Sequence, residues 1–333
     1  MKHFSSISLT LAAAAATCVC AQDLNQTIVG CIEVGCPPSS TDTVNDDCRV
    51  ADSSFPSVGL TRIPTKNKDL DGKLSWTKGF NVTDRGAAGG QEFHSSFYFG
   101  TAPDLDLSGT GACAVFLHGV EPSLSFDKVD KNLESAQGTC ADAMGNDCVT
   151  ALIDRAKKLV DGFGSNPPSS EEACARLQDD LDKNMDHACL SLTKGSWTDL
   201  TTAVLTGEGA PAAITGDKNA SSTCWPVLPK QNQLALVSDQ KTNGSDQEDV
   251  IQKATYAITP ILTLFFPTGK NSVISEADAS LSCVKVVGPS KASVDTASNG
   301  TQDHDSGVAK AFEHSQSGLF GFVMAVVAAV SLL

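Results

Sequence analysis

The segment Asp104-Leu-Asp106-Leu-Ser108 carries oxygen-bearing side chains at the alternate spacing of a calcium-binding loop. Loops of this type end on a bidentate glutamate at their twelfth position, which is Val115 in this chain. Half of the ligand set is therefore missing. We expect this segment to bind no metal and to form a turn that leads into a strand beginning at Ala112.

Paired carboxylates are the groups that a glycosidase needs on the two sides of the bond it cleaves. The densest acids are Asp127 with Asp130, and Asp179 with Asp180 and Asp182. The second set falls on the polar side of an expected helix, where charge usually serves solvation. Neither set has the aromatic neighbours of a sugar-binding site, so we expect neither to be catalytic.

Hydrolases that use a nucleophile or a metal carry motifs that this sequence lacks, among them G-x-S-x-G, H-E-x-x-H and the P-loop. His94 and His118 fall in strands that we expect to be neighbours, so the two rings could face each other across a sheet. A histidine pair without a third ligand is more often ordinary packing than a metal or catalytic site. We expect no catalytic residue, no cofactor and no metal.

Flat aromatic rings are the other feature that would indicate sugar binding. The rings that could form such a platform are Trp76, Tyr98, Trp197 and Trp225. Aromatic residues make up only 6% of the chain. With so few rings to fill the core, we expect these four to be buried rather than displayed.

The cysteines indicate an oxidising compartment. Of the 12 cysteines in the chain, two lie in an expected leader peptide and ten remain. The ten that we expect to be disulfide-bonded are Cys31, Cys36, Cys48, Cys113, Cys140, Cys148, Cys174, Cys189, Cys224 and Cys283. An even number without C-x-x-C spacing or a cysteine and histidine cluster predicts five disulfides rather than a metal site.

Five N-x-S/T sequons point to N-glycosylation in the same compartment. Their acceptor residues are Asn25, Asn81, Asn219, Asn243 and Asn299. Asn219 and Asn243 have polar neighbours typical of surface loops, where a glycan fits most easily. Asn81 is the weaker candidate because it ends an expected strand.

The N-terminus has the features of a signal peptide. A polar start is followed by an apolar run over 4–16 and by the small residues Val19-Cys20-Ala21, which predict cleavage after Ala21. A transmembrane helix is the alternative, but this run is shorter than the roughly 20 residues that a bilayer requires.

The C-terminus has the features of a glycosylphosphatidylinositol (GPI) attachment signal. Residues 319–333 are uncharged and mostly apolar, residues 308–318 form a polar spacer, and the small triplet Asp305-Ser306-Gly307 precedes them. We expect the anchor on Asp305, with Ser306 or Asn299 as second choices. A tail anchor or a buried terminal helix is the alternative.

The net charge of −15 disfavours two classes of partner. An acidic surface repels phosphate backbones and anionic lipid headgroups, so we expect no nucleic-acid binding and no direct electrostatic docking to membranes. The acids are spread along the chain, which is typical of a solvated surface.

The interior of the chain predicts strands on either side of a helical hairpin. Strands are expected at 60–63, 73–83, 92–99, 112–118, 233–237, 255–266 and 281–287. Helices are expected from 149 to 160 and after Ser169, whose hydroxyl can accept from the Glu172 amide in a capping box. Folding this hairpin near residue 164 places Cys140 opposite Cys189.

Two further pairings follow as hypotheses. In the same hairpin, Cys148 would bond to Cys174, and Cys224 with Cys283 would close the last block of strands. Pro260 lies inside one expected strand, which indicates an edge position, a bulge or two shorter strands.

We therefore expect a mainly β, α+β protein with an antiparallel β-sandwich and an inserted, disulfide-pinned helical hairpin at about 140–192. The expected organisation is a signal peptide at 1–21, a Cys/Pro-rich irregular segment at 22–56, the β-rich ectodomain at 57–287, a disordered stalk at 288–305 and a removed propeptide at 306–333.

Together, the leader, the ten cysteines, the five sequons and the Asp305 triplet resemble the GPI-anchored, cysteine-containing cell-surface proteins of filamentous fungi. The resemblance covers general organisation and no named catalytic family. It implies a protein of the plasma membrane or cell wall, with the membrane as partner through the lipid and wall polysaccharide as a second partner. We expect a structural, adhesive or wall-organising role; a carbohydrate-binding or carbohydrate-active domain is the alternative.

Overall fold

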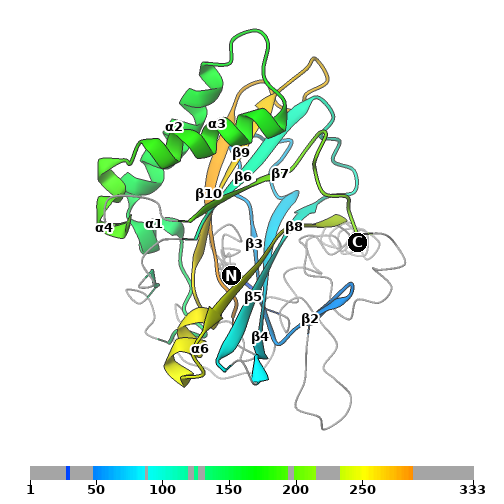
Figure 1. Ribbon diagram of the computed structural model, residues 1–333. Coiled ribbons are helices and arrows are strands. Elements are labelled where there is room, and N and C mark those ends of the chain that lie inside the picture. Colours follow the sequence, from blue (N-terminus) through cyan, green and yellow to red (C-terminus); the bar gives the residue numbers. More distant parts are fainter. Residues whose placement is uncertain are drawn as a thin grey trace, which may run out of the picture.

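Two antiparallel sheets pack face to face, and helices cover the outside of one of them, in a computed structural model of the chain (Figure 1). The structure describes residues 28–30, 48–86, 89–118, 124–126, 132–193, 199–214 and 233–287. The predicted fold class is confirmed: the protein is mainly β and α+β overall.

The first sheet has the strand order β3-β4-β5-β8. Its strands are β3 (Ser57–Arg62), β4 (Leu74–Asp84), β5 (Gln91–Thr101) and β8 (Gln233–Gly244). A β-bulge lies where β8 passes the Phe97/Tyr98 step of β5. Leu236 lies opposite Tyr98, and Asp239 lies opposite Ser96. Tyr98 and Ser96 are two residues apart and share a face of β5, whereas Leu236 and Asp239 are three apart because the bulge inserts an extra residue in β8.

The second sheet has the order β10-β9-β6-β7. Its strands are β10 (Asp278–Val284), β9 (Thr259–Pro267), β6 (Thr110–Leu117) and β7 (Leu200–Val204). Side chains on its inner face pack against the first sheet, and those on its outer face pack against helices. Both faces of this sheet are therefore covered by other elements.

Trp76 joins the two sheets at the centre of the sandwich. Its ring packs against Phe99 at 5.4 Å and Phe116 at 5.7 Å between centroids, and it is fully buried. Its Nε1 donates to Thr263 Oγ1 of β9 at 3.0 Å, so the indole is satisfied inside the core. Burial of a side chain this large stabilises the fold by roughly 2–3 kcal/mol.

The helical layer consists of α1 (Cys140–Met144), α2 (Asn146–Asp161), α3 (Ser170–Lys183), η2 (His187–Cys189) and α4 (Leu190–Thr193). It lies between β6 and β7, as the predicted insert does. The Ser169 hydroxyl accepts from the Glu172 amide at 3.2 Å, which confirms the predicted N-cap of α3. No helix among the described residues combines the length and apolar character that crossing a bilayer requires.

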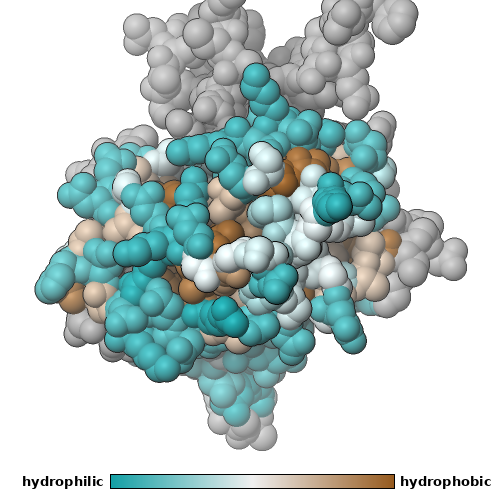
Figure 2. Space-filling view, turned by 90° about the horizontal axis from the view of Figure 1, so that it is seen from above, coloured by the Kyte–Doolittle hydropathy of each residue, from teal (hydrophilic) through white to brown (hydrophobic). Residues whose placement is uncertain are grey.

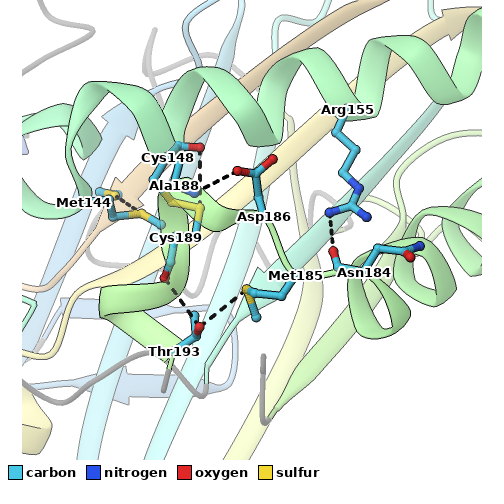
Figure 3. Close-up of a disulfide and its surroundings, with 10 residues drawn as sticks. Met144, Cys148, Arg155, Asn184, Met185, Asp186, Ala188, Cys189 and Thr193 are labelled. Carbon is cyan, nitrogen blue, oxygen red and sulfur yellow. Dashed lines mark hydrogen bonds between the residues drawn. A yellow bond between two sulfur atoms is a disulfide. The ribbon is translucent and has the colours of Figure 1, made fainter. Parts of the chain in front are cut away.

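The disulfides of this layer differ from the predicted pairs. Cys148 bonds to Cys189 (Figure 3). Cys140 bonds to Cys283 of β10. The predicted pairs were Cys140 with Cys189 and Cys148 with Cys174. These two bonds pin α2 to the turn after α3 and pin α1 to the second sheet.

The reason is that Cys140 lies in a separate short helix, α1, which comes before the predicted helix at 149–160. Gly145 has a φ of 85°, a conformation that disfavours residues with a Cβ, and it separates α1 from α2. A capping box of Thr139 and Asp142 starts α1 as an independent helix. Cys140 therefore faces β10 rather than the end of the hairpin.

The remaining cysteines differ in whether they are bonded. Cys113 and Cys174 are free, buried thiols, although the sequence led us to expect both to be bonded. Cys48 is disulfide-bonded. Cys31, Cys36 and Cys224 lie outside the described residues, as does the predicted bond of Cys224 to Cys283, and Cys283 has a different partner.

Pro260 is neither on an edge strand nor at a bulge, because β9 lies between β10 and β6. It is the second residue of β9, one position beyond Ile261, where pairing with β6 ends. The missing N–H therefore removes no bond of that ladder. Before it, α6 (Glu248–Thr255) forms a helix where the predicted strand was expected to begin.

The outer face of the first sheet is covered near β3 by a short hairpin of β1 (Cys48–Val50) and β2 (Ser53–Phe55). Phe55 and Val50 pack there with Tyr98 and Leu60, and Val29 forms a single β-bridge to Leu60. The described part of the 22–56 segment is therefore more regular than expected.

Candidate functional site

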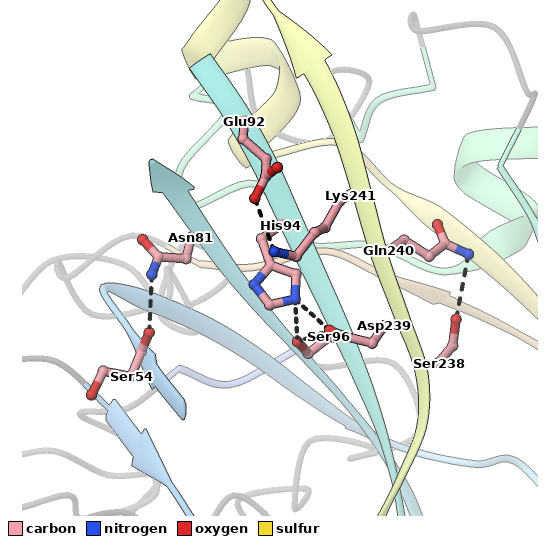
Figure 4. Close-up of polar contacts among 9 residues, drawn as sticks. All are labelled: Ser54, Asn81, Glu92, His94, Ser96, Ser238, Asp239, Gln240 and Lys241. Atoms are coloured by element: carbon pink, nitrogen blue, oxygen red, sulfur yellow. Dashed lines mark hydrogen bonds and ion pairs between the residues drawn. The ribbon is translucent and has the colours of Figure 1, made fainter. Parts of the chain in front are cut away.

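A polar cluster on the outer face of the first sheet brings together residue types that can do chemistry. It comprises Glu92, His94 and Ser96 of β5 with Asp239 and Lys241 of β8, and we call it the outer-face cluster (Figure 4). Strand alternation aligns the three β5 side chains, and pairing across the ladder places His94 beside Lys241 and Ser96 beside Asp239.

Ser96, His94 and Asp239 have the composition of a catalytic triad but a different geometry. Asp239 Oδ1 accepts from Ser96 Oγ at 2.7 Å and also bonds to His94 Nε2. In a triad, serine donates to one histidine nitrogen while the carboxylate holds the other. Here the serine donates to the carboxylate, and its Oγ lies 3.5 Å from the same Nε2, so the histidine does not stand between serine and aspartate as it does in a triad.

The other two members of the outer-face cluster form an ion pair. Lys241 Nζ lies 3.0 Å from Glu92 Oε1, with side chains 57% and 33% exposed. Exposed pairs of this kind contribute at most about 1 kcal/mol. The outer-face cluster is therefore a partly exposed hydrogen-bond and ion-pair network whose geometry differs from that of a catalytic triad.

Two predicted glycosylation sites lie on the strands around this cluster. Asn81 lies opposite His94, and Asn243 lies opposite Glu92. Asn243 is exposed, as a glycan acceptor must be, whereas Asn81 is half-buried and its Nδ2 donates to Ser54 O at 3.3 Å. Asn25, Asn219, Asn299 and the predicted anchor residue Asp305 lie outside the described residues.

Lys78 places a buried amine inside the sandwich, and no motif pointed to it. It is 2% exposed, and its Nζ donates to Ala257 O at 2.8 Å and to Thr259 Oγ1 at 3.2 Å. Burial lowers the pKa of Lys78 to about 7, with a smaller contribution from Lys285. A neutral amine is a nucleophile, but this one is almost fully buried and lines neither of the two hollows described below.

Lys285 is buried in the same region. It is 2% exposed, donates to the backbone oxygens of Leu133 and Glu134, and lies over the Tyr256 ring at 5.5 Å. Burial is the main cause that raises the pKa of Tyr256 to about 12. Both lysines thus bind carbonyl groups that close the end of the sandwich near α6.

His118 lies at the end of β6 and faces the interior. Its Nε2 hydrogen-bonds Thr201 Oγ1 at 3.1 Å and contacts Gln240, and its ring stacks on Phe116. Burial, with help from Lys78, lowers the pKa of His118 to about 4. The imidazole is therefore neutral at physiological pH.

The predicted approach of His94 and His118 is wrong. β5 and β6 belong to different sheets, and His94 lies on the outer face of the first sheet while His118 points between the sheets. The sequence had suggested neighbouring strands because β5 and β6 follow each other in the chain. Across the described residues, no group of three or more His, Cys, Asp or Glu side chains could hold a metal ion.

The segment at Asp106 is a turn, as the sequence predicted. Asp106 accepts from the Ser108 amide at 2.8 Å and from the Ser108 hydroxyl at 2.9 Å. These bonds lower the pKa of Asp106. Asp104 lies 3.7 Å from Lys73, so both carboxylates have local partners.

The acids of α3 are also used locally. Asp179 pairs with Lys183 at 2.7 Å one turn later, and Asp180 pairs with Arg155 of α2. Arg155 also donates to the Asn184 carbonyl, which ties α2 to the end of α3 (Figure 3). Asp127, Asp130, Trp197 and Trp225 lie outside the described residues.

Two hollows of about 300 and 340 Å³ adjoin the loop at Leu107 and Ser108. Small hydroxyl-bearing, proline and glycine residues form much of their walls, and Phe99, on the wall of the first, is only 4% exposed. The end of the molecule seen in Figure 2 is mainly hydrophilic, with hydrophobic residues in small separate areas. Neither hollow offers a flat ring on which a sugar could stack.

Comparison of the chain with protein-family models, with curated proteins and with solved structures finds no match. The geometry of the described residues therefore supplies the structural argument for function.

Proposed function

We propose that this chain is a non-enzymatic protein of the cell exterior, with a structural, adhesive or wall-organising role, held by a GPI anchor at Asp305. The observation that carries the proposal is that the aromatic rings and acids which could bind or cleave a sugar are buried or bonded to neighbouring residues. Trp76 is buried and Tyr98 is 2% exposed. Asp179 and Asp180 of α3 are paired with neighbouring cations, and Ser96 donates to Asp239 rather than to His94.

Export is supported by the cross-links. Two disulfides fix the helical layer, and Cys48 is bonded as well. Disulfides of this structural kind form and persist in oxidising compartments. Exposed Asn243 adds a site at which a glycan could be carried.

Treatment of intact cells with phosphatidylinositol-specific phospholipase C tests the location. The proposal predicts that the protein moves from the cell surface into the medium, and that a variant with a stop codon at 306 is secreted without treatment. Retention of the chain on treated cells, together with unchanged retention of the truncated chain, would contradict the anchor.

The competing function is a carbohydrate-binding ectodomain, for which the hollows beside Leu107 and Ser108 are the place to look. A glycan array separates the two hypotheses. We expect no selective binding above that of a glycosylated control protein. Strong binding to one glycan class that is lost in a Ser108→Trp variant would favour the alternative.

A further inference from the structure

Two free cysteines lie between the helical layer and the second sheet. Cys113 is on β6, on the face that the helices cover, and Cys174 is near the start of α3. They are 0% and 2% exposed. Both belong to the hydrophobic core that α2 and α3 form with this sheet.

Their neighbours place the two sulfur atoms together. Cys113 lies opposite Val204 in the pairing of β6 with β7. Cys174 Sγ lies 3.6 Å from the backbone oxygen of Ala203. Ala203 precedes Val204, so Cys174 lies above the part of β7 that pairs with Cys113. Cys174 is also the neighbour that contributes most to raising the pKa of Cys113.

We infer that Cys113 and Cys174 form a disulfide in the exported protein, which cross-links α3 to β6. The inference rests on the export proposed above. Cys148, the partner that the sequence suggested for Cys174, is bonded to Cys189. With this third bond, α1, α2 and α3 would each carry a cross-link, two of them running directly to the second sheet.

The chemistry is thiol–disulfide exchange with a disulfide-bearing oxidant of the secretory pathway. The thiolate of one cysteine attacks the oxidant disulfide and forms a mixed disulfide, which releases one oxidant thiolate. The second cysteine then attacks the sulfur of the first, and the second oxidant thiolate leaves. The cysteines lose two electrons and two protons, and the oxidant becomes a dithiol.

The surroundings also set when this exchange takes place. The neighbouring Cys174 thiol, together with burial, raises the pKa of Cys113 well above its ordinary value. A buried thiol with a high pKa forms little thiolate and meets no oxidant. The bond must therefore form before α3 closes over the sheet.

Peptide mapping of the secreted protein tests the pairing. The denatured, unreduced protein is alkylated and cut with trypsin, which places Cys113 in peptide 86–128 and Cys174 in peptide 159–176. Cys148 falls in a different peptide, 132–155. We expect 86–128 joined to 159–176 and neither cysteine alkylated. Alkylation of both, or a bond from 159–176 to any other peptide, would overturn the inference.

A second arm separates the pairing from the compartment. The purified protein is reduced in urea and reoxidised in a glutathione buffer, so export plays no part. A bond between Cys113 and Cys174 here, with free thiols in the native protein, would refute the oxidising location while the pairing holds. Absence of the bond in both samples would refute the pairing itself.

Variants provide the control for the mapping. C174A should leave Cys113 alkylated, with the bonds of Cys140 and Cys148 unchanged. The matched variant C189A should leave Cys148 alkylated and the 86–128 to 159–176 link intact. If C174A does not fold, the mapping of the wild-type chain alone still decides the pairing.

Discussion

Lys78 lies at a position of β4 whose side chain points into the core, although lysine is usually found at the surface. Leu74, Trp76, Phe80 and Val82 share one face of β4, as their spacing predicted, and Lys78 shares the same parity. The alternation of residues along β4 therefore indicated that the Lys78 side chain points inward. What the sequence could not supply were its partners, because Ala257 and Thr259 lie far along the chain.

The buried amine makes stability depend on pH. The pKa of Lys78 is about 7 in the folded protein and near 10.5 when unfolded. Between pH 7 and 10.5 the unfolded chain has Lys78 protonated while the folded chain has it neutral. The free energy of unfolding therefore rises with pH by up to about 1.4 kcal/mol per pH unit. Below pH 7 both states bind this proton, so the contribution of Lys78 no longer changes with pH. From pH 7.5 to 9.0, the free energy of unfolding of K78M should rise by about 2 kcal/mol less than that of wild type.

Urea unfolding at the two pH values measures this difference. K253M is the matched control, because the Lys253 side chain is 65% exposed. We expect this substitution to leave the pH dependence of stability as it is in wild type. Equal pH dependence in K78M and wild type would show that Lys78 is not a buried, neutral amine.

His118 acts in the acidic range. Its pKa is about 4 in the folded protein against 6.5 when unfolded, so the unfolded chain binds more protons in this window and stability is lost as the pH falls through it. From pH 7 to 4.5, H118Q should lose about 2 kcal/mol less stability than wild type. The control is H187Q, since His187 is exposed. A thermal-melting series whose pH dependence matches in wild type and H118Q would contradict the burial of a neutral ring.

At the scale of elements, local patterns predicted most of the strands and helices. β3, β4, β5 and β6 lie where alternating residues indicated them, and α3 starts at its predicted Ser169 cap. α6 was missed, although acids in its first turn and apolar residues at 250, 251 and 254 are typical of a short amphipathic helix. Its position next to an apolar strand hid its boundary.

Three local irregularities explain the other errors. The bulge in β8 breaks the alternation, so only 233–237 of that strand was recognised. Gly145 separates α1 from α2, so Cys140 belongs to a helix of its own that the sequence did not indicate. Pro260 is tolerated because it lies beyond the end of pairing with β6. Each depends on where a neighbouring element ends, which a local pattern does not contain.

The hydrogen bond between Trp76 and Thr263 is the testable link between the sheets. W76F leaves a cavity and an unpaired Thr263 hydroxyl, so it should destabilise the protein by about 2 kcal/mol. In the W76F background, T263V should cost about 1 kcal/mol less than in wild type, because its partner is already absent. A double-mutant cycle by urea unfolding measures both values, and fully additive effects would show that the bond contributes nothing.

At the scale of the whole molecule, the fold class was predictable and the arrangement of chemistry was not. Residue type suggested a pair of His94 and His118, whereas the division of successive strands between two sheets separates them. Disulfide partners likewise depend on how helices pack onto a sheet: Cys140 and Cys283 are 143 residues apart. The outer-face cluster was missed because its members come from β5 and β8, which are distant in sequence.

The proposed removal of the C-terminal segment is the central claim, and the last peptides of the cell-surface protein test it most directly. Trypsin would release residues 292–310 as one peptide from an unprocessed chain, since Lys291 and Lys310 flank it. After removal of N-glycans, we predict a peptide 292–305 that carries an ethanolamine phosphate remnant on Asp305. Recovery of the unmodified 292–310 peptide from the surface protein would contradict the proposed anchor.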